Sequence, residues 1–177
     1  MSEIPYTLRI SRRSRHLRVT VKPGGFVVVS APPRVSSGSV ERFVAAHRDW
    51  LHRAIARMGK LKTLPVSGRR DYLAHKERAR RDISVRVAAW AQRLGLSPGR
   101  ISIKDMRRSW GSCSANGNLN FSYRVAFLPE ELFEYVVVHE LCHLLEHNHS
   151  RAYWAHVEAA LPDYRARRAV LRAYVQH

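Results

Sequence analysis

The sequence predicts an α+β fold in which a basic, β-rich first part with one helix precedes a small sheet packed on long helices. Three observations lead to this prediction. Apolar or alternating runs near the N-terminus are separated by turn residues, two long segments repeat apolar residues with helical spacing, and a histidine-rich segment continues an apolar helix. With 177 residues, 45% of them hydrophobic, the chain suits one domain, or one domain with a small additional lobe.

The first part is expected to contain three strands and one helix. The runs YTLRI (6–10), HLRVTV (16–21) and GFVVVSA (25–31) have strand patterns, and KPGG (22–25) supplies a tight turn. A cluster of serines then offers caps for a single helix that we expect to continue to about Met58. Its predicted apolar stripe consists of Phe43, Val44, Trp50, Leu51 and Ile55.

A linker rich in Gly, Pro and Ser (59–68) is expected to join the two parts of the chain. We therefore divide the sequence into a basic β-rich region at 1–66 and a second region at 67–177, which we expect to form one compact unit. The second region should begin with a long helix over about 69–95, which ends at Gly95.

Further elements are predicted after this helix. A strand is expected at 101–106, and an Asn-Gly turn at 114–118 should lead into a strand at 118–128. Pro129, followed by two glutamates, marks the start of a helix that carries VVVHELCHLLEHNHS (136–150). We expect a last helical region at about 150–176, interrupted near LPD (161–163).

Positive charge is concentrated in the first half of the sequence. Residues 1–100 hold 22 Lys+Arg and 6 Asp+Glu, whereas residues 101–177 hold 9 and 8. This asymmetry indicates that the basic N-terminal half could bind a polyanion such as nucleic acid. The alternative is a solvated arginine face, because the chain contains 26 arginines and only 5 lysines.

The composition also predicts where the protein functions. Two cysteines are too few for a disulfide framework, so we expect free thiols and no disulfides. No apolar run approaches the roughly 18 residues that span a bilayer, and no secretory signal precedes the first strand. We therefore expect a cytoplasmic protein that does not bind membranes.

The sequence HELCH is an HExxH motif with the chemistry of a zinc site. His139 and His143 are four residues apart, so on a helix their side chains project from the same face and can share one ion. Neutral imidazole is a good zinc ligand. Glu140 stands one residue away, where a carboxylate can act on water at the metal. The motif therefore predicts one Zn²⁺ per chain.

A catalytic zinc needs a third protein ligand and one open position. His149 follows His143 by six residues, a spacing at which the chain can leave the helix and turn back, and Asn148 could make this turn in the left-handed conformation. Glu158 is the alternative third ligand. Tyr153, His156 or an arginine could stabilise the oxyanion of the reaction.

Residues 107–161 resemble the YgjP-like metallopeptidase family, which is related to the SprT-like and WLM zincins. The resemblance rests on SWGSC (109–113) with GNLNFSYR (117–124), on VVVHELCHLLEHNHS, and on YWAHV (153–157). It implies a zincin-like fold, His139, His143 and His149 as zinc ligands, and Glu140 as the catalytic acid and base.

The resemblance also suggests a role for NLNFSYR (118–124). In zincins, a strand edge beside the motif helix binds an extended peptide by adding it to the sheet. On this basis Asn120 and Tyr123 would contact the substrate. The alternative is that NLNFSYR forms a central core strand, which offers no free edge.

These observations favour a zinc-dependent metallohydrolase, most specifically a metallopeptidase that acts on a peptide or protein. A second hypothesis is a metal-dependent nucleotide phosphohydrolase that uses the same site, with arginines such as Arg107, Arg108 and Arg124 holding phosphates. A third is a nucleic-acid-binding protein with a structural metal site. Structural zinc usually has four protein ligands with cysteine prominent, which makes the third hypothesis the weakest.

Overall fold

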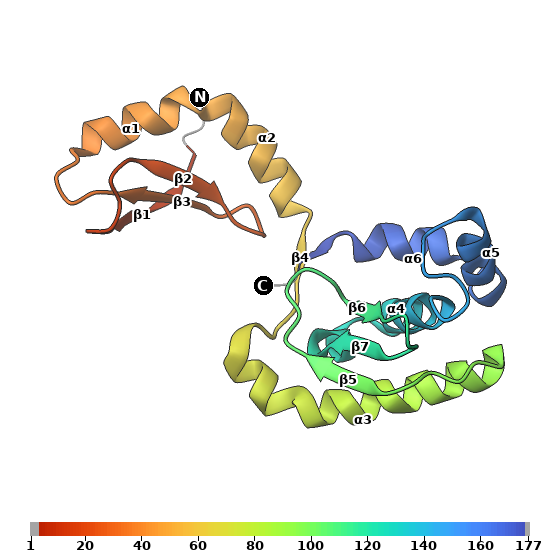
Figure 1. The fold of residues 1–177 in the computed structure, drawn as a ribbon. Coiled ribbons are helices and arrows are strands. Elements are labelled where there is room, and N and C mark those ends of the chain that lie inside the picture. The colour runs from red at the N-terminus through yellow and green to blue at the C-terminus, as the bar shows by residue number, and fades with distance from the viewer. Residues whose placement is uncertain (1–3, 176–177) are drawn as a thin grey trace. The chain divides into compact units, whose positions relative to one another are not determined.

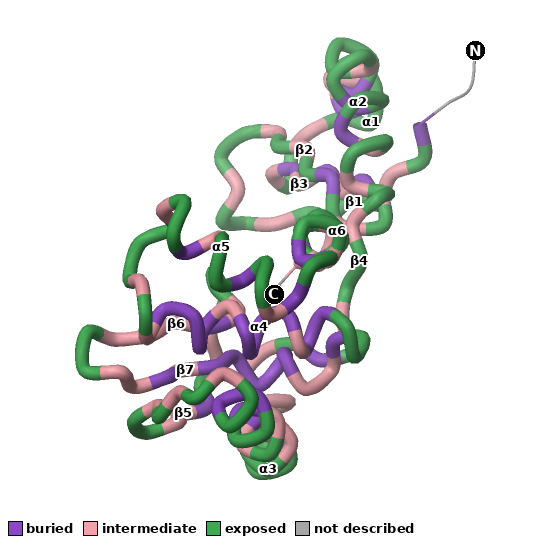
Figure 2. Tube along the Cα trace, turned by 90° about the vertical axis from the view of Figure 1, so that its right-hand side faces the viewer, coloured by how far each residue is buried: buried purple, intermediate pink, exposed green. Residues whose placement is uncertain are grey.

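The computed structural model describes residues 4–175, which form a mixed α+β fold divided into two compact units. The first unit extends to Lys62 and the second begins at Thr63. Each unit has its own hydrophobic core, visible in Figure 2 as separate groups of buried residues. Within the described residues, no helix is both long and apolar enough to cross a membrane.

The first unit is a three-stranded sheet covered on one face by two helices (Figure 1). Its elements are β1 (Tyr6–Ile10), β2 (Arg18–Val21), β3 (Val27–Ala31), α1 (Ser37–Ala46) and α2 (Arg48–Gly59). Strand β3 is central, parallel to β1 and antiparallel to β2. Alternate residues of β3, namely Val27, Val29 and Ala31, are buried against Val44 and Leu51 of the helices.

The single helix expected from the serine caps to Met58 is wrong, because the chain breaks at His47 into α1 and α2. The His47 Nδ1 atom lies 2.8 Å from the Phe43 carbonyl oxygen, and the His47 backbone N–H bonds to the carbonyl of Val44. These local bonds replace the regular helical pattern. The break lets α2 bury Leu51 while Trp50 stays 42% exposed.

The second unit contains a small sheet, four helices and a 3₁₀ turn. A short strand, β4 (Lys62–Thr63), leads from the first unit into it. The remaining elements are α3 (Gly68–Leu94), β5 (Ile101–Lys104), β6 (Gly111–Cys113), β7 (Leu119–Ser122), η1 (Tyr123–Phe127), α4 (Glu130–Cys142), α5 (Arg151–Ala160), α6 (Tyr164–Leu171) and β8 (Tyr174–Val175). As expected, Gly95 ends α3 in the left-handed conformation, with a φ of 66°.

The expected strand at 118–128 is wrong beyond Ser122, where the chain enters η1. The Ser122 hydroxyl accepts a hydrogen bond from the backbone N–H of Arg124, which caps the turn. The strand order is β5-β7-β6, with β7 parallel to β5 and antiparallel to β6. Strand β7 is therefore the central strand, and β6 lies at an edge.

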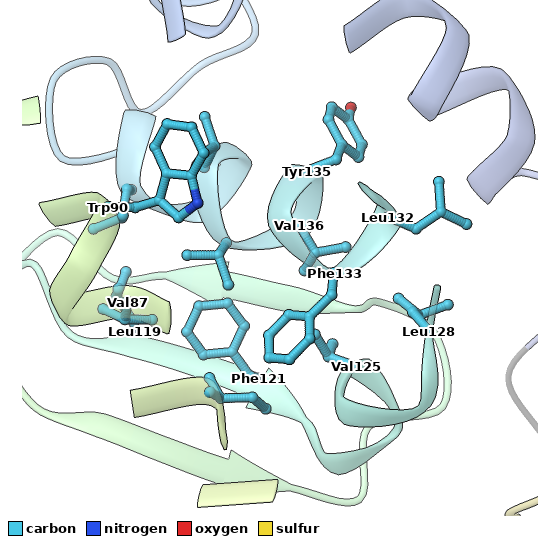
Figure 3. Packing of buried hydrophobic residues seen from close by; sticks show 14 of the residues in the cluster. Val87, Trp90, Leu119, Phe121, Val125, Leu128, Leu132, Phe133, Tyr135 and Val136 are labelled. Atoms are coloured by element: carbon cyan, nitrogen blue, oxygen red, sulfur yellow. The ribbon is translucent and has the colours of Figure 1, made fainter. Parts of the chain in front are cut away.

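The core of the second unit forms where β7 meets α3 and α4. Figure 3 shows Phe121 of β7 between Val87 of α3 and Phe133 of α4. Phe121 and Leu119 are fully buried. Burial of one such side chain contributes roughly 1.5–3 kcal/mol, so these contacts fix α4 against the sheet.

A buried ion pair joins the segment after β5 to η1. The guanidinium of Arg124, which is fully buried, donates to Asp105 Oδ1 at 2.7 Å and to the Met106 carbonyl oxygen at 3.1 Å. Asp105 is itself only 14% exposed. The pair therefore holds the end of the central strand in place.

We predict that Asp105→Ala lowers the free energy of unfolding by about 3 kcal/mol, because it leaves a buried guanidinium without its carboxylate. The measurement is urea denaturation followed by circular dichroism. Asp82→Ala is the matched control, since Asp82 pairs with Arg78 at the surface and its loss should cost less than about 0.5 kcal/mol. Equal losses in the two variants would contradict the structural role of Arg124.

Candidate metal centre and active site

Three histidines converge at the end of α4. His139 lies on α4, His143 is the residue that ends it, and His149 follows in the loop before α5. One ring nitrogen from each histidine can be chosen so that all three lie within 4.8 Å of one another. The Nε2 atoms of His139 and His149 are 3.2 Å apart. Two tetrahedral ligands at the usual Zn–N length would lie about 3.3 Å apart, so this spacing fits a shared zinc ion.

The loop between α4 and α5 brings His149 back to the helix. The Asn148 side-chain oxygen accepts a hydrogen bond from the Ser150 backbone N–H at 2.9 Å, and the Ser150 hydroxyl caps α5. The expected left-handed conformation of Asn148 is wrong, because no described residue other than glycine has a positive φ. The turn is made by the Asn148 side chain instead.

Hydrogen bonds to Nδ1 orient two of the imidazoles, those of His139 and His143. The Nδ1 of His143 lies 2.9 Å from the Glu146 carbonyl oxygen, to which it can only donate. The Nδ1 of His139 lies 2.6 Å from the Tyr153 hydroxyl, which donates in turn to the His139 carbonyl at 3.0 Å. Both bonds favour a proton on Nδ1 and leave Nε2 as the metal-binding atom.

The surroundings favour the neutral form of two of the imidazoles, those of His139 and His149. The pKa of His139 is lowered to about 3, chiefly by burial and in the same direction by the nearby His143, His149 and Arg168. Burial also lowers the pKa of His149. Because zinc binds the neutral imidazole, a low pKa prepares both histidines for a metal at neutral pH.

Glu140 is the buried carboxylate of this site. It is only 4% exposed, and its Oε2 atom has no hydrogen-bond partner among the described residues. Burial raises its pKa to about 8. A buried carboxyl oxygen without a partner is costly in a folded protein, which indicates that it serves a ligand or a reaction.

Gly111 of β6 makes room for Glu140. A Cβ atom at position 111 would lie 2.6 Å from the Oε1 and Cγ atoms of Glu140, closer than real Cβ contacts. The edge strand therefore passes directly over the carboxylate, and only glycine leaves space for it. The close approach joins the sheet edge and the histidine cluster into one site.

The three histidines and Glu140 line a cleft of about 530 Å³. The segment around β6 forms one wall, α4 a second, and α6 with β8 a third. The lining residues are Ser109, Trp110, Gly111, Ser112, Cys113, Tyr135, Val136, His139, Glu140, His143, His147, His149, Arg168, Leu171, Arg172 and Tyr174.

Two of the residues considered for catalysis lie elsewhere than expected. Tyr153 is fully buried and contacts His139 rather than the cleft. His156 is exposed on α5 and does not line the cleft, whereas His147 does. Glu158, the alternative third ligand, is 52% exposed, lies 3.7 Å from Arg165, and is outside the histidine cluster of the described residues.

Two residues of NLNFSYR, Asn120 and Tyr123, were expected to contact the substrate, but both lie outside the cleft. Asn120 donates a hydrogen bond to the Ser112 hydroxyl within the sheet, and Tyr123 is fully buried with its hydroxyl bonded to the Gly68 carbonyl oxygen. Strand β7 pairs with β5 on one side and with β6 on the other, so the alternative prediction of a central core strand is confirmed for residues 119–122. The edge that borders the cleft belongs to β6.

The cleft also contains residues that the sequence analysis did not identify. Tyr135 precedes His139 by four residues, a spacing that helical periodicity could have revealed. Arg168 lies in α6 and Arg172 directly follows it, and no local pattern indicates that this segment returns to the metal centre. Of the arginines named earlier for phosphate binding, Arg124 is committed to Asp105, and neither Arg107 nor Arg108 lines the cleft.

Comparison with protein families identifies the chain. The model described as YgjP-like, metallopeptidase domain, matches residues 15–73 and 69–174. The chain therefore belongs to the YgjP-like metallopeptidase family and is a peptidase of the hydrolase class. Membership implies a divalent metal, which the histidine cluster can hold.

Two solved structures are similar to part of the chain. One is the metallopeptidase zymogen abylysin of Pyrococcus abyssi, with 25% identity over 50% of this chain and 87% of that chain, and a TM-score of 0.44. The other is the metallopeptidase zymogen jannalysin of Methanocaldococcus jannaschii, with 23% identity over 49% and 93% of the respective chains, and a TM-score of 0.41. A search of curated proteins found no match.

We predict that Tyr153→Phe lowers zinc affinity about 10-fold or more, because it removes the hydrogen bond that orients His139. The measurement is competition with a metal-binding dye. Tyr164→Phe is a matched control, since Tyr164 is also buried but its hydroxyl bonds to Arg165 instead of a histidine. An unchanged affinity in Tyr153→Phe would show that the hydrogen bond does not support the site.

Metal-free Glu140→Gln should be more stable than the metal-free parent at pH 7.5, by about 1 kcal/mol or more. The unfolded carboxyl ionises above its ordinary pKa of 4.5, whereas the folded one keeps its proton up to about pH 8. The contribution of protonated Glu140 to the free energy of unfolding of the parent is therefore fully present below pH 4.5 and is lost as the pH rises from 4.5 to about 8. Urea denaturation across this range, with chelator present, measures the difference. A difference that does not change with pH would contradict the burial of Glu140.

Proposed function

We propose that the protein cleaves peptide bonds with zinc held by His139, His143 and His149, and with Glu140 as the catalytic base and acid. The observation that carries this proposal is the buried Oε2 of Glu140, which has no hydrogen-bond partner among residues 4–175 and shares one cleft with three converging imidazoles. Three nitrogen ligands without a fourth protein ligand are the usual set of a catalytic rather than a structural zinc site.

Zinc at this site would supply a Lewis acid that activates water and polarises the scissile carbonyl. Glu140 takes the proton from the attacking water and later delivers it to the leaving amine. A carboxyl whose pKa is raised toward neutrality suits both steps, because it accepts and returns a proton near the working pH. Tyr153 acts as a positioning residue through its bond to His139.

The edge of β6 is the proposed binding site for an extended peptide. Strand β6 pairs with β7 on one side only, and residues 109–113 line the cleft. A peptide that adds to this edge makes main-chain hydrogen bonds, which give affinity without demanding one sequence. Because Glu140 lies against Gly111, such a peptide would cross the reacting carboxylate.

Two arginines at the end of α6, Arg168 within the helix and Arg172 directly after it, support a second candidate function, the hydrolysis of nucleotides at the same metal. Arg168 and Arg172 both line the cleft, and guanidinium groups are well suited to bind phosphate oxygens. In a peptidase, the same groups could stabilise the oxyanion or hold a substrate carboxylate. The two candidates therefore share one site and differ in the substrate.

A cytoplasmic location is part of the proposal and is supported by the cysteines. Cys113 and Cys142 are both free thiols, as expected for a reducing compartment. A nucleic-acid partner is a separate proposal, because the lysine and arginine side chains that would bind it lie in the first unit.

Glu140→Gln should keep one zinc per chain and reduce proteolysis of an unstructured protein by about 100-fold or more, since it removes the proton acceptor. Glu158→Gln is the matched control and should retain full activity, because Glu158 lies outside the cleft. The measurements are zinc content and the rate of appearance of new amino termini.

The same proteins are then tested with a panel of nucleoside triphosphates. Phosphate or pyrophosphate release that requires Glu140, without proteolysis, would replace the peptidase proposal with the nucleotide one. In that case Arg168→Ala should raise the KM for the nucleotide. Proteolysis that survives Glu140→Gln would contradict the mechanism altogether.

A further inference from the structure

The sheet of the first unit has one face that the helices do not cover. The helices pack on the face that carries Val27, Val29 and Ala31, so the alternate residues of each strand lie on the other face. We call this second surface the open face. By strand register it consists of Thr7 and Arg9 of β1, Arg18 and Thr20 of β2, Val28 and Ser30 of β3, and Lys22 and Phe26 at the end of the hairpin.

Among the residues that define the open face, Arg9, Arg18 and Lys22 carry positive charge and none carries a carboxylate. Arg9 of β1 and Arg18 of β2 both lie opposite Ser30 in the strand register, one on each side of the central strand, and both are exposed. Residues 4–35 contain seven lysines and arginines and no aspartate or glutamate. Within the described residues, neither Arg9, Arg18 nor Lys22 forms an ion pair. These charges are therefore available to an anionic partner.

The basic surface continues into the loop between β1 and β2. A hollow of about 400 Å³ opens beside the strands and is lined by Arg13, Ser14, Arg15, His16, Leu17, Arg18 and Ser30. It shares Arg18 and Ser30 with the open face, so the two surfaces are continuous. Together they form a cationic track, defined here as the open face and the 13–17 loop.

An exposed aromatic ring stands on the same surface. Phe26 is 71% exposed, and together with Val85 it is the most exposed of the large apolar residues described. Its ring lies over Gly24 in the hairpin turn. By strand register, Thr7, Thr20 and Val28 lie between Phe26 and the arginines, and their side chains are small. Sheet faces that carry cations and an exposed aromatic ring are typical of surfaces on which unpaired bases stack.

We propose that this cationic track binds single-stranded nucleic acid. Arg9, Arg18 and the loop arginines contact the phosphates, and Phe26 stacks on a base. Single strands fit better than a duplex because a duplex hides the base faces that Phe26 would contact. The proposal goes beyond the proposed hydrolytic site and does not depend on it, since every residue concerned lies in the first unit.

The test measures binding of the full chain, carrying Glu140→Gln to prevent turnover, to a fluorescent oligothymidine by anisotropy. The double variant Arg9→Ala with Arg18→Ala should bind about 10-fold more weakly near 0.1 M salt. Its slope of log affinity against log salt should become shallower by about 1.4, because two phosphate contacts are lost. Arg53→Ala with Arg57→Ala removes equal charge from exposed positions on α2 and is the matched control, with a change below about 3-fold.

A second pair of variants tests the aromatic contact. Phe26→Ala should weaken binding of the single strand about 5-fold or more and leave duplex binding unchanged, whereas Phe26→Trp should retain both. Trp50→Ala, which removes an exposed aromatic ring from α2, should have no effect. Circular dichroism of each variant checks that the first unit remains folded.

Three results would overturn the proposal. The first is an equal loss of oligonucleotide affinity in the two double-arginine variants. The second is duplex binding that is as tight as single-strand binding and does not depend on Phe26. The third is tighter binding to vesicles containing phosphatidylserine than to the oligonucleotide. The last result would make the track a membrane contact. Loss of hydrolytic activity in Glu140→Gln leaves all three readouts unaffected, so failure here is distinguishable from failure of the proposed function.

Discussion

The packing of α4 between the sheet and the later helices is the constraint on which the metal centre depends. Nine of the thirteen residues of α4 are buried, among them Phe133, Val137 and Leu141. This burial fixes both the position and the rotation of the helix, so His139, Glu140 and His143 have little freedom. The imidazole of His139 is then held by Tyr153 from α5, and His149 enters from the intervening loop. The site is therefore rigid because its supporting helix belongs to the core.

Placing polar groups in this apolar setting has an electrostatic consequence. The same burial that fixes the helix lowers the pKa of His139 and raises that of Glu140. The first shift keeps an imidazole neutral for a metal, and the second gives a carboxyl that can exchange a proton near neutral pH. Gly111 completes the arrangement, because its missing side chain lets the sheet edge approach the carboxylate. Burial is thus the largest cause of both pKa shifts, and the chemistry of the site follows mainly from its position at the margin of the core.

Local patterns predicted those features that depend on neighbouring residues in the sequence. The four-residue spacing of His139 and His143 and the end of α3 at Gly95 are such features, and the structure contains both helices. The family resemblance on HELCH and the flanking blocks is confirmed by the family match. What local patterns could not reveal are contacts between distant segments. Arg168 reaches the cleft only because α6 folds back, and β7 became the central strand because β5 and β6 pair on its two sides. The break at His47 was missed because a histidine gives no breaker signal comparable to Gly or Pro.

The most direct test of this account compares zinc binding by His149→Ala and His147→Ala. Both histidines line the same cleft and both are exposed, but only His149 belongs to the converging cluster. Zinc affinity is measured by competition with a chelating dye at pH 7.5. The account predicts that His149→Ala lowers the affinity about 100-fold or more, whereas His147→Ala changes it by less than about 3-fold. Equal affinities in the two variants would contradict the three-histidine centre.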